Sequence, residues 1–335
     1  MKICLSIAIA LLVSSCVSKP LKLHSYKAVK MGVDFRIDLY AESEEIAEHA
    51  ASKAFDRIEQ INSVMSDYIV DSELWKLSDS SGSNSAFRVS NDMWQILNFS
   101  KRINQLSEGA FDITAGPYIL LWRKARVIKR LPDERSMKRA ANRVGMDKIM
   151  FNDVDKSVKL AVPKMRLDLG GVAKGYAADE ALKVLKAEGI EYAMVDGSGD
   201  ISMTAHPEGD WRIFISDSQE SSGFFVELSS CSIATSGDTF QNVEIGGKRF
   251  SHIVDPKTGI GVTDSFRVTV IARDGKTADA LASSLTVMGP KKGISLVEKM
   301  NGVEALVSKM EDGKRISYKS SGFPKMNFKN HMEKK

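Results

Sequence analysis

Cysteine is scarce in this sequence of 335 residues, and its placement excludes a disulfide framework. Of three cysteines, Cys4 and Cys16 lie near the start of the chain, and Cys231 is alone in the rest. C-x-x-C pairs of the kind that bind metals or exchange disulfides are absent. The fold must therefore be held by an ordinary hydrophobic core, and 43% hydrophobic with 27% charged residues is typical of a soluble globular protein.

Several motifs that would indicate a familiar chemistry are also missing. The five histidines form no H-E-x-x-H or similar metal pair. The glycine-rich stretch at residues 196–200 lacks the G-x-S-x-G spacing of a serine hydrolase. Forty-seven basic against 43 acidic residues give a formal charge of +4, and the longest basic cluster, residues 122–130, has few aromatics. We interpret that cluster as a solvated face and expect no nucleic-acid partner.

The N-terminus is typical of a bacterial lipoprotein signal. A charged Met1-Lys2 start precedes an apolar run at residues 3–13, too short to span a membrane, and small residues lead directly to Cys16. We expect residues 1–15 to be removed, Cys16 to carry the lipid, residues 16–22 to form a tether and residues 23–335 the functional domain. The protein would be exported and anchored to a bacterial membrane facing the periplasm, with the choice of inner or outer membrane open. An ordinary signal peptide with an incidental cysteine is the alternative.

Hydrophobic periodicity predicts an α+β protein with a single catalytic domain. Three- and four-residue apolar spacing predicts helices at residues 41–68, 91–109, 132–145, 176–189, 276–289 and 290–302. Short segments rich in β-branched and aromatic residues predict strands at 192–196, 211–217, 224–228, 250–255 and 266–272. Consecutive strands between residues 211 and 250 are joined by short turns, so we expect antiparallel pairing.

The loop LDLGGVAKGYAAD, residues 167–179, could hold an anion. It matches neither G-x-G-x-x-G, because Gly170 and Gly171 are adjacent, nor the Walker pattern, because Lys174 precedes its glycine. Glycines followed by a helix start favour an anionic ligand. A plain strand-to-helix turn explains the same residues equally well.

Three further clusters could take part in chemistry. Asp279 and Ser283 are four residues apart, so they share a helix face and could offer oxygen ligands to Mg²⁺; a helix-start aspartate beside a packing serine is the alternative. His252 precedes an Asp-Pro turn and is either a base or a packed strand histidine. Residues 108–122 combine an aromatic, an acid and a Gly-Pro turn. The sequence physics assigns no function to this segment.

The motifs LDLGGVAKGYAAD, VDGSGDI, TSGD, HIVDPKTG and ADALASSLTVMG, in that order, resemble the ApbE family of FAD:protein FMN transferases. The resemblance extends from KMGVDFRI through MSDY, SELWKL and GAFDITAGP, and so covers nearly the whole chain after the leader. It implies an ApbE-like α+β fold with mixed or antiparallel sheets flanked by helices. It also implies that FAD is a substrate, which is cleaved with Mg²⁺ so that FMN passes to a threonine or serine of an acceptor protein and AMP is released.

The same resemblance implies roles for individual residues. Mg²⁺ would be held by the main-chain carbonyl of Ala173 and by Asp279 and Ser283, where Ser283 replaces the family's usual threonine. His252 is the candidate base, and Lys174 could add positive charge near the phosphates. The flavin nucleotide would be contacted at Met31, Tyr68, Ala110, Phe111, Asp112, Gly170, Tyr176 and Val254.

The sequence is also compatible with two other functions. Given water instead of a protein hydroxyl, the same site would act as an FAD pyrophosphatase that yields FMN and AMP. The chain could also be a non-enzymatic FAD-binding lipoprotein, which the presence of Asp279, Ser283 and His252 argues against. For the transferase, the resemblance implies acceptors such as exported subunits of sodium-translocating quinone reductase (Nqr) and the related Rnf complex.

Overall fold

The computed structural model describes residues 20–216, 223–237, 242–264, 266–311 and 314–324. Cys16 and the predicted leader lie outside these ranges. Within them, no helix has the length and apolar character needed to cross a membrane. The first strand begins at Lys22, at the end of the predicted tether.

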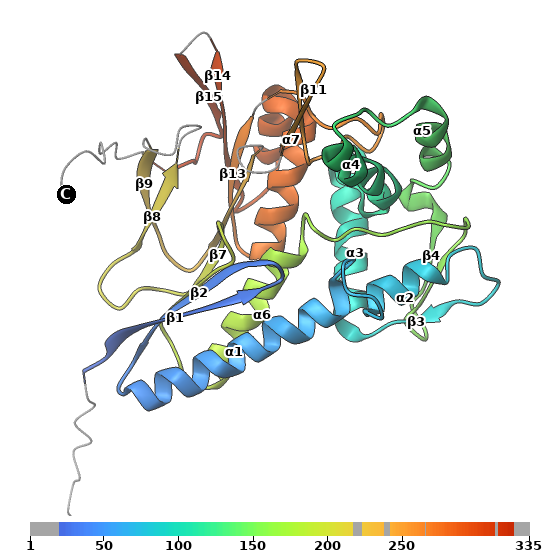
Figure 1. Ribbon diagram of the computed structural model, residues 1–335. Coiled ribbons are helices and arrows are strands. Elements are labelled where there is room, and N and C mark those ends of the chain that lie inside the picture. The colour runs from blue at the N-terminus through green and yellow to red at the C-terminus, as the bar shows by residue number, and fades with distance from the viewer. Residues whose placement is uncertain (1–19, 217–222, 238–241, 265, 312–313, 325–335) are drawn as a thin grey trace, which may run out of the picture.

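An antiparallel sheet of eight strands forms the centre of the fold (Figure 1). Every neighbouring pair in it is antiparallel. In spatial order the strands are β1 (Lys22–Lys30), β2 (Val33–Ala41), β6 (Ala193–Asp196), β7 (Asp200–Met203), β10 (Ser232–Gly237), β13 (Arg267–Ala272), β14 (Glu304–Glu311) and β15 (Lys314–Lys319).

Helices cover one face of this sheet and a hairpin covers the other. Successive side chains of a strand point to opposite faces, so Val195 of β6 joins the helical core while its neighbour Met194 packs with the hairpin. The hairpin is β8 (Trp211–Ser216) with β9 (Gly223–Leu228). Figure 1 shows α6 (Ala173–Ala187) and α7 (Gly275–Val297) against the sheet, with α1 (Glu44–Met65) packed along α6.

Capping and glycine chemistry set the limits of these helices. The hydroxyl of Ser43 accepts a hydrogen bond from the N–H of Ile46 at 3.3 Å and so begins α1. The two helices predicted at residues 276–289 and 290–302 are the two halves of α7, which kinks at Gly289 (φ 73°) before Pro290. The prediction of two helical segments is therefore confirmed, and they are continuous except for the kink at Gly289.

A smaller helical region lies beside the sheet and completes the fold. It holds a three-stranded sheet, ordered β3-β5-β4, and the hairpin β11–β12 packs against its helix α4. Its elements are α2 (Glu73–Asp79), β3 (Phe87–Arg88), α3 (Asn91–Leu106), η1 (Ile113–Ala115), α4 (Gly116–Ile128), α5 (Glu134–Ala141), η2 (Met146–Lys148), β4 (Ile149–Asn152), β5 (Ser157–Leu160), β11 (Asn242–Ile245) and β12 (Lys248–Ser251).

Two expectations need correction. The strand predicted at residues 250–255 ends at Ser251, so His252 lies in the bend after β12 and not within a strand. Beyond it, Val254 and Gly261 form an isolated antiparallel bridge that closes the turn.

The basic cluster at residues 122–130 is not simply a solvated face: most of it belongs to α4, whose Trp122 and Ala125 are buried.

Candidate active site

A cavity of about 710 Å³ opens where the smaller helical region meets α6 and α7, and its size suits a small-molecule ligand. Segments far apart in sequence line it, from the β1–β2 turn to α7. The structure brings most of the predicted residues together here, namely Met31, Tyr68, Ala110, Phe111, Asp112, Gly170, Ala173, Lys174, His252, Val254, Asp279 and Ser283.

Two glycines let α6 and α7 cross with their backbones in contact at one wall of this cavity. A Cβ added to Gly275 would lie 2.5 Å from the carbonyl oxygen of Gly175. A Cβ added to Gly175 would collide with the Gly275 carbonyl and lie 2.9 Å from Cβ of Asp279. Because only glycine fits at both positions, the start of α6 and the Asp279 turn of α7 are held side by side.

Asp279 is buried at this crossing and faces the first turn of α6. Its Oδ2 accepts a hydrogen bond from the N–H of Gly175 at 3.1 Å. Burial raises the pKa of the Asp279 carboxyl, while the charge of Lys174 and the Gly175 N–H oppose that rise. Within the described part of the chain, no donor reaches the other oxygen, Oδ1, so it is available to a ligand.

Ser283 lies one turn further along α7 and behaves unlike the neighbouring hydroxyls. Ser284 donates to the carbonyl of Ala280 at 2.6 Å, and Thr286 donates to that of Ala282 at 2.8 Å. The Ser283 hydroxyl makes no hydrogen bond to any residue that the structure describes. A Cβ added to Gly171 would lie 2.9 Å from its Oγ, so this hydroxyl points at the glycine loop.

These oxygen atoms fit a magnesium ion. Asp279 offers a carboxylate oxygen and Ser283 a hydroxyl, and Ala173, the first residue of α6, lines the same cavity. Mg²⁺ prefers oxygen ligands and usually takes few of them from the protein, with waters and phosphates completing its shell. Lys174 also lies at this wall, where its ammonium pairs with the buried carboxylate of Asp200 on β7.

The opposite wall contains charged residues that the sequence did not single out. Arg123 of α4 donates to Asp67 at 2.5 Å and to Asp168 at 2.9 Å, and its guanidinium lies 4.1 Å from the centre of the Tyr68 ring. Burial, followed by the charge of Asp67, raises the pKa of the Asp168 carboxyl, and Arg123 opposes this. Arg126 also lines the cavity. A spacing signal was available, because Ile119, Arg123 and Arg126 recur at helical intervals.

The segment at residues 108–122 now has an explanation. Asp112 begins η1, where its Oδ1 accepts from the N–H of Thr114 at 2.8 Å and from its hydroxyl at 2.6 Å. The side chain of Asn104 donates to the carbonyl of Phe111 at 2.7 Å. Burial raises the pKa of Asp112, while the two bonds from Thr114 oppose the shift. These contacts fix the Ala110–Asp112 segment as part of the cavity wall.

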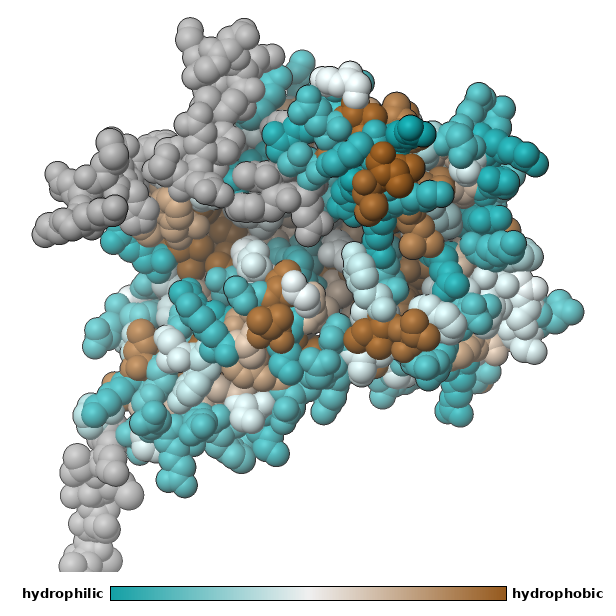
Figure 2. All heavy atoms as spheres, in the orientation of Figure 1, coloured by the Kyte–Doolittle hydropathy of each residue, from teal (hydrophilic) through white to brown (hydrophobic). Residues whose placement is uncertain are grey.

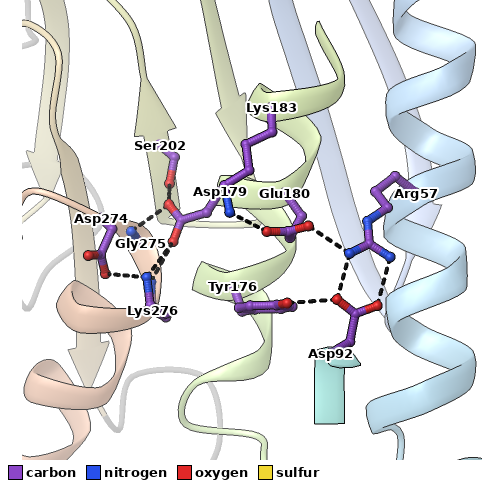
Figure 3. A network of polar contacts seen from close by, with 10 residues as sticks. All are labelled: Arg57, Asp92, Tyr176, Asp179, Glu180, Lys183, Ser202, Asp274, Gly275 and Lys276. Carbon is purple, nitrogen blue, oxygen red and sulfur yellow. Dashed lines mark hydrogen bonds and ion pairs between the residues drawn. The ribbon is translucent and has the colours of Figure 1, made fainter. Parts of the chain in front are cut away.

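Tyr176 is the one predicted flavin contact in the domain that the structure places elsewhere. Its ring is buried, and its hydroxyl donates to Asp92 at 2.7 Å (Figure 3). Asp92 is also bound by Arg57, which in turn binds Glu180. Burial and the hydrogen bond to Asp92 raise the pKa of the Tyr176 phenol. Its side chain joins α6 to α1 and α3, so its position gives no support to a flavin contact.

His252 and Val254 lie in the loop that closes the cavity after β12. Both line the cavity, and His252 is half-buried. The turn beyond them is fixed from two sides: Gly259 donates to the carbonyl of Asp255 at 2.8 Å, and the indole N–H of Trp122 donates to the carbonyl of Gly259 at 2.7 Å. Hydrogen bonds therefore fix the chain just beyond the histidine, which lies at the cavity wall.

The fold and the cavity define the class: an antiparallel α+β protein with a large cavity between a glycine loop on one wall and charged side chains of α4 on the other. The chain belongs to the ApbE family, whose profile matches residues 31–307. A relative from Vibrio cholerae serotype O1, named FAD:protein FMN transferase, is 33% identical over 330 residues, which cover 95% of this chain and 96% of the relative. One of the same name from Haemophilus influenzae is 31% identical, with 96% of each chain covered.

Solved structures agree with this assignment. The flavin transferase ApbE from Vibrio cholerae superposes with a TM-score of 0.81 at 29% identity, covering 91% of this chain and 99% of that one. The ApbE protein of Thermotoga maritima also gives 0.81, at 26% identity, with 90% and 98% covered. The α+β fold predicted from the sequence is thus confirmed.

Proposed function

We propose that this protein is an FAD:protein FMN transferase. One observation carries the proposal: Asp279 Oδ1 and the Ser283 hydroxyl are both available to a ligand, and both residues line the cavity beside the glycine loop. His252 lines the same cavity. The size of the cavity and the names of the relatives in Vibrio cholerae and Haemophilus influenzae support the same conclusion.

The reaction is a transfer at phosphorus. The hydroxyl oxygen of an acceptor threonine or serine attacks the phosphorus on the FMN side of the FAD pyrophosphate, the bridging P–O bond breaks, and AMP leaves with the bond's electrons. His252 accepts the proton of the attacking hydroxyl as general base. Lys174, at the start of α6, adds positive charge beside the pyrophosphate, and Tyr68 offers an exposed aromatic face to the isoalloxazine ring.

Ala173, Asp279 and Ser283 would hold Mg²⁺ in this site. When bound, the ion offsets the negative charge that develops on the pyrophosphate oxygens. The protein's own part is to keep Asp279 desolvated and anchored through Gly175, so that one carboxylate oxygen faces the ligand. Serine in place of threonine at position 283 retains the coordinating hydroxyl but lacks the methyl group that limits its rotation.

Acceptors are exported proteins, such as the flavin-bearing subunits of Nqr- and Rnf-type complexes. We propose that the protein meets them at a bacterial membrane surface, to which a lipid on Cys16 holds it. The cysteine that follows the apolar run of the leader supports this proposal. Replacement Cys16→Ser should move the protein from the membrane to the soluble fraction, and an unchanged distribution would contradict the lipid anchor.

The function is tested by incubating the protein with FAD, Mg²⁺ and a purified Nqr-type acceptor subunit. We expect an acceptor whose mass has grown by one FMN unit, with release of AMP, and no product after chelation of the metal. Free FMN and AMP without labelling would assign a pyrophosphatase instead. Tight FAD binding without any cleavage would assign a flavin-binding lipoprotein.

A further inference from the structure

Helix α4 presents three distinct rows of side chains, one buried in the core, one lining the cavity and one exposed to solvent. Tyr118, Trp122 and Ala125 are buried in the core. Ile119, Arg123 and Arg126 line the cavity. Successive residues are about 100° apart around a helix, so the residues that follow this second row lie immediately beside the cavity. We call these residues the α4 outer face and include in it Leu131, which lies three residues beyond the end of the helix; the face consists of Leu120, Lys124, Val127, Ile128 and Leu131.

The α4 outer face is unusually apolar for a solvent-exposed surface. Val127 is 82% exposed and Leu131 53%, with Leu120 and Ile128 close to half exposed. In Figure 2 a brown patch framed by teal lies where Figure 1 places α4. Scattered apolar side chains are ordinary on a protein surface, but a cluster of them indicates a binding site.

A second exposed apolar segment lies on the same side of the cavity. Residues 68–70 are all exposed, with Tyr68 at 74% and Val70 at 63%. The Tyr68 ring contacts Arg123 of α4, which also binds the adjacent Asp67. Tyr68 and Ile69 themselves line the cavity. Exposed apolar residues therefore lie next to the cavity both on α4 and on this segment.

Positive charge is concentrated around the α4 outer face. Residues 120–131, which include this face, hold five lysines and arginines and no acid, whereas the whole chain has a formal charge of only +4. Lys124, Lys129 and Arg130 form no ion pair with any residue that the structure describes. A surface with unpaired positive charge around apolar side chains favours a partner with acidic residues around apolar ones.

We propose that the α4 outer face, together with residues 68–70, is the docking surface for the acceptor protein, and that it selects acceptors with an acidic, partly apolar surface beside the modified hydroxyl. This rests on the proposed function, which requires a protein to bring its hydroxyl to the cavity. A small substrate or water would need no apolar surface outside the cavity.

The test compares two pairs of substitutions in the otherwise intact protein. Lys124→Glu with Arg130→Glu reverses charge on the docking surface, and Val127→Ser with Leu131→Ser removes apolar contact. Matched controls are Lys53→Glu with Lys186→Glu, and Val154→Ser, all exposed and outside the cavity lining. For each variant one measures binding of the purified acceptor subunit, kcat/KM for its labelling, and the dissociation constant of FAD.

We expect the charge reversal to lower kcat/KM for the acceptor by about tenfold or more and to reduce its salt dependence, because such charges set the association rate. The serine pair should weaken acceptor binding, with FAD affinity and both controls unchanged. Normal labelling by both test pairs would overturn the proposal. An equal loss in the controls would also overturn it. Binding to phosphatidylglycerol vesicles tests an anionic membrane as the alternative occupant: a charge-reversed variant that loses vesicle binding but keeps normal acceptor kinetics would overturn the proposal as well. A wild-type protein that binds the acceptor without labelling it would instead refute the proposed function.

Discussion

Two aspartates lie on either side of the crossing of α6 and α7, Asp279 buried and Asp179 mostly so, and they differ in how many hydrogen bonds they accept. Asp179 of α6 accepts hydrogen bonds from the N–H groups of Gly275 and Lys276, at 2.6 and 3.1 Å, and from the hydroxyl of Ser202 at 2.9 Å (Figure 3). Asp279 of α7 accepts one, from the N–H of Gly175. Each helix thus caps the other's first turn.

The difference is the one expected between a carboxylate that stabilises the fold and one that binds a ligand. Burial raises the pKa of both carboxyls, but in Asp179 three hydrogen bonds oppose the rise, whereas in Asp279 the leading opposing influence is the charge of Lys174. Both oxygens of Asp179 accept hydrogen bonds, two from the start of α7 and one from Ser202 of β7. Asp279 keeps an oxygen for a ligand, because the same crossing supplies it with a single donor.

The largest effect should come from Asp279→Asn. The amide keeps the size of the side chain and can still accept from Gly175, but it removes the negative charge that would hold the proposed metal ion. We expect Mg²⁺-dependent cleavage of FAD to fall about 10²–10³-fold, in the range seen when a charge-stabilising group is removed from an active site. Rates are measured as AMP release across a Mg²⁺ titration, with Asp153→Asn as an exposed control. Full activity in the variant would remove Asp279 from the metal site.

Asp179→Ala should instead act on stability. It leaves two N–H groups of α7 and a buried hydroxyl without an acceptor, which we expect to lower the free energy of unfolding by about 2–4 kcal/mol. Urea denaturation measures the loss. Asp179→Asn retains acceptor oxygen for the Gly275 N–H and should recover part of it. If Ala and Asn variants were both as stable as the wild type, the reciprocal capping would be unimportant.

Gly275→Ala tests the close crossing on which both aspartates depend. The new methyl group meets the carbonyl oxygen of Gly175, which is backbone and cannot move aside freely. Overpacking of this kind costs about 1–3 kcal/mol. Gly237→Ala is the matched control, since its added Cβ would find its nearest neighbours at ordinary contact distance, 3.7 Å away. Equal stability of the two variants, measured by thermal unfolding, would show that the helices can separate without cost.

The two candidate oxygen ligands could be predicted from the sequence, but their surroundings could not, and the reason is physical. Asp279 and Ser283 lie on one helix, so a four-residue spacing reveals them. Arg123 reaches Asp67 and Asp168 only through tertiary structure, and no local pattern relates residues 45 or more positions apart. Tyr176 is the converse case: it adjoins the glycine loop in sequence, and its hydroxyl donates to Asp92 outside the cavity, which its sequence position does not reveal.

The long amphipathic helix at residues 41–68 was predictable because its periodicity extends over several turns. The β1–β2 hairpin was not predicted, although its register is regular from Lys22 opposite Ala41 to Lys30 opposite Val33. Its first strand has no fully buried residue, so it lacks the apolar pattern that identifies a strand. Its second strand is recognised as central only once β6 is known to pair with it.

The smallest effect concerns the pH dependence of the metal-free protein. Because burial raises the folded-state pKa of Asp279 above its unfolded value, folding favours the protonated form, and stability declines as the pH rises through the folded-state pKa. Asp279→Asn has no such charge. Without metal, the variant should therefore be the more stable of the two at neutral pH, and its advantage should disappear below the ordinary pKa of an aspartate, about 4. Paired urea titrations in chelator, from acidic to neutral pH, measure this gap. Added Mg²⁺ should close this stability gap at neutral pH, because it stabilises the wild type alone. If the wild type were instead the more stable protein in chelator at neutral pH, the Lys174 charge and the Gly175 N–H would outweigh burial at Asp279.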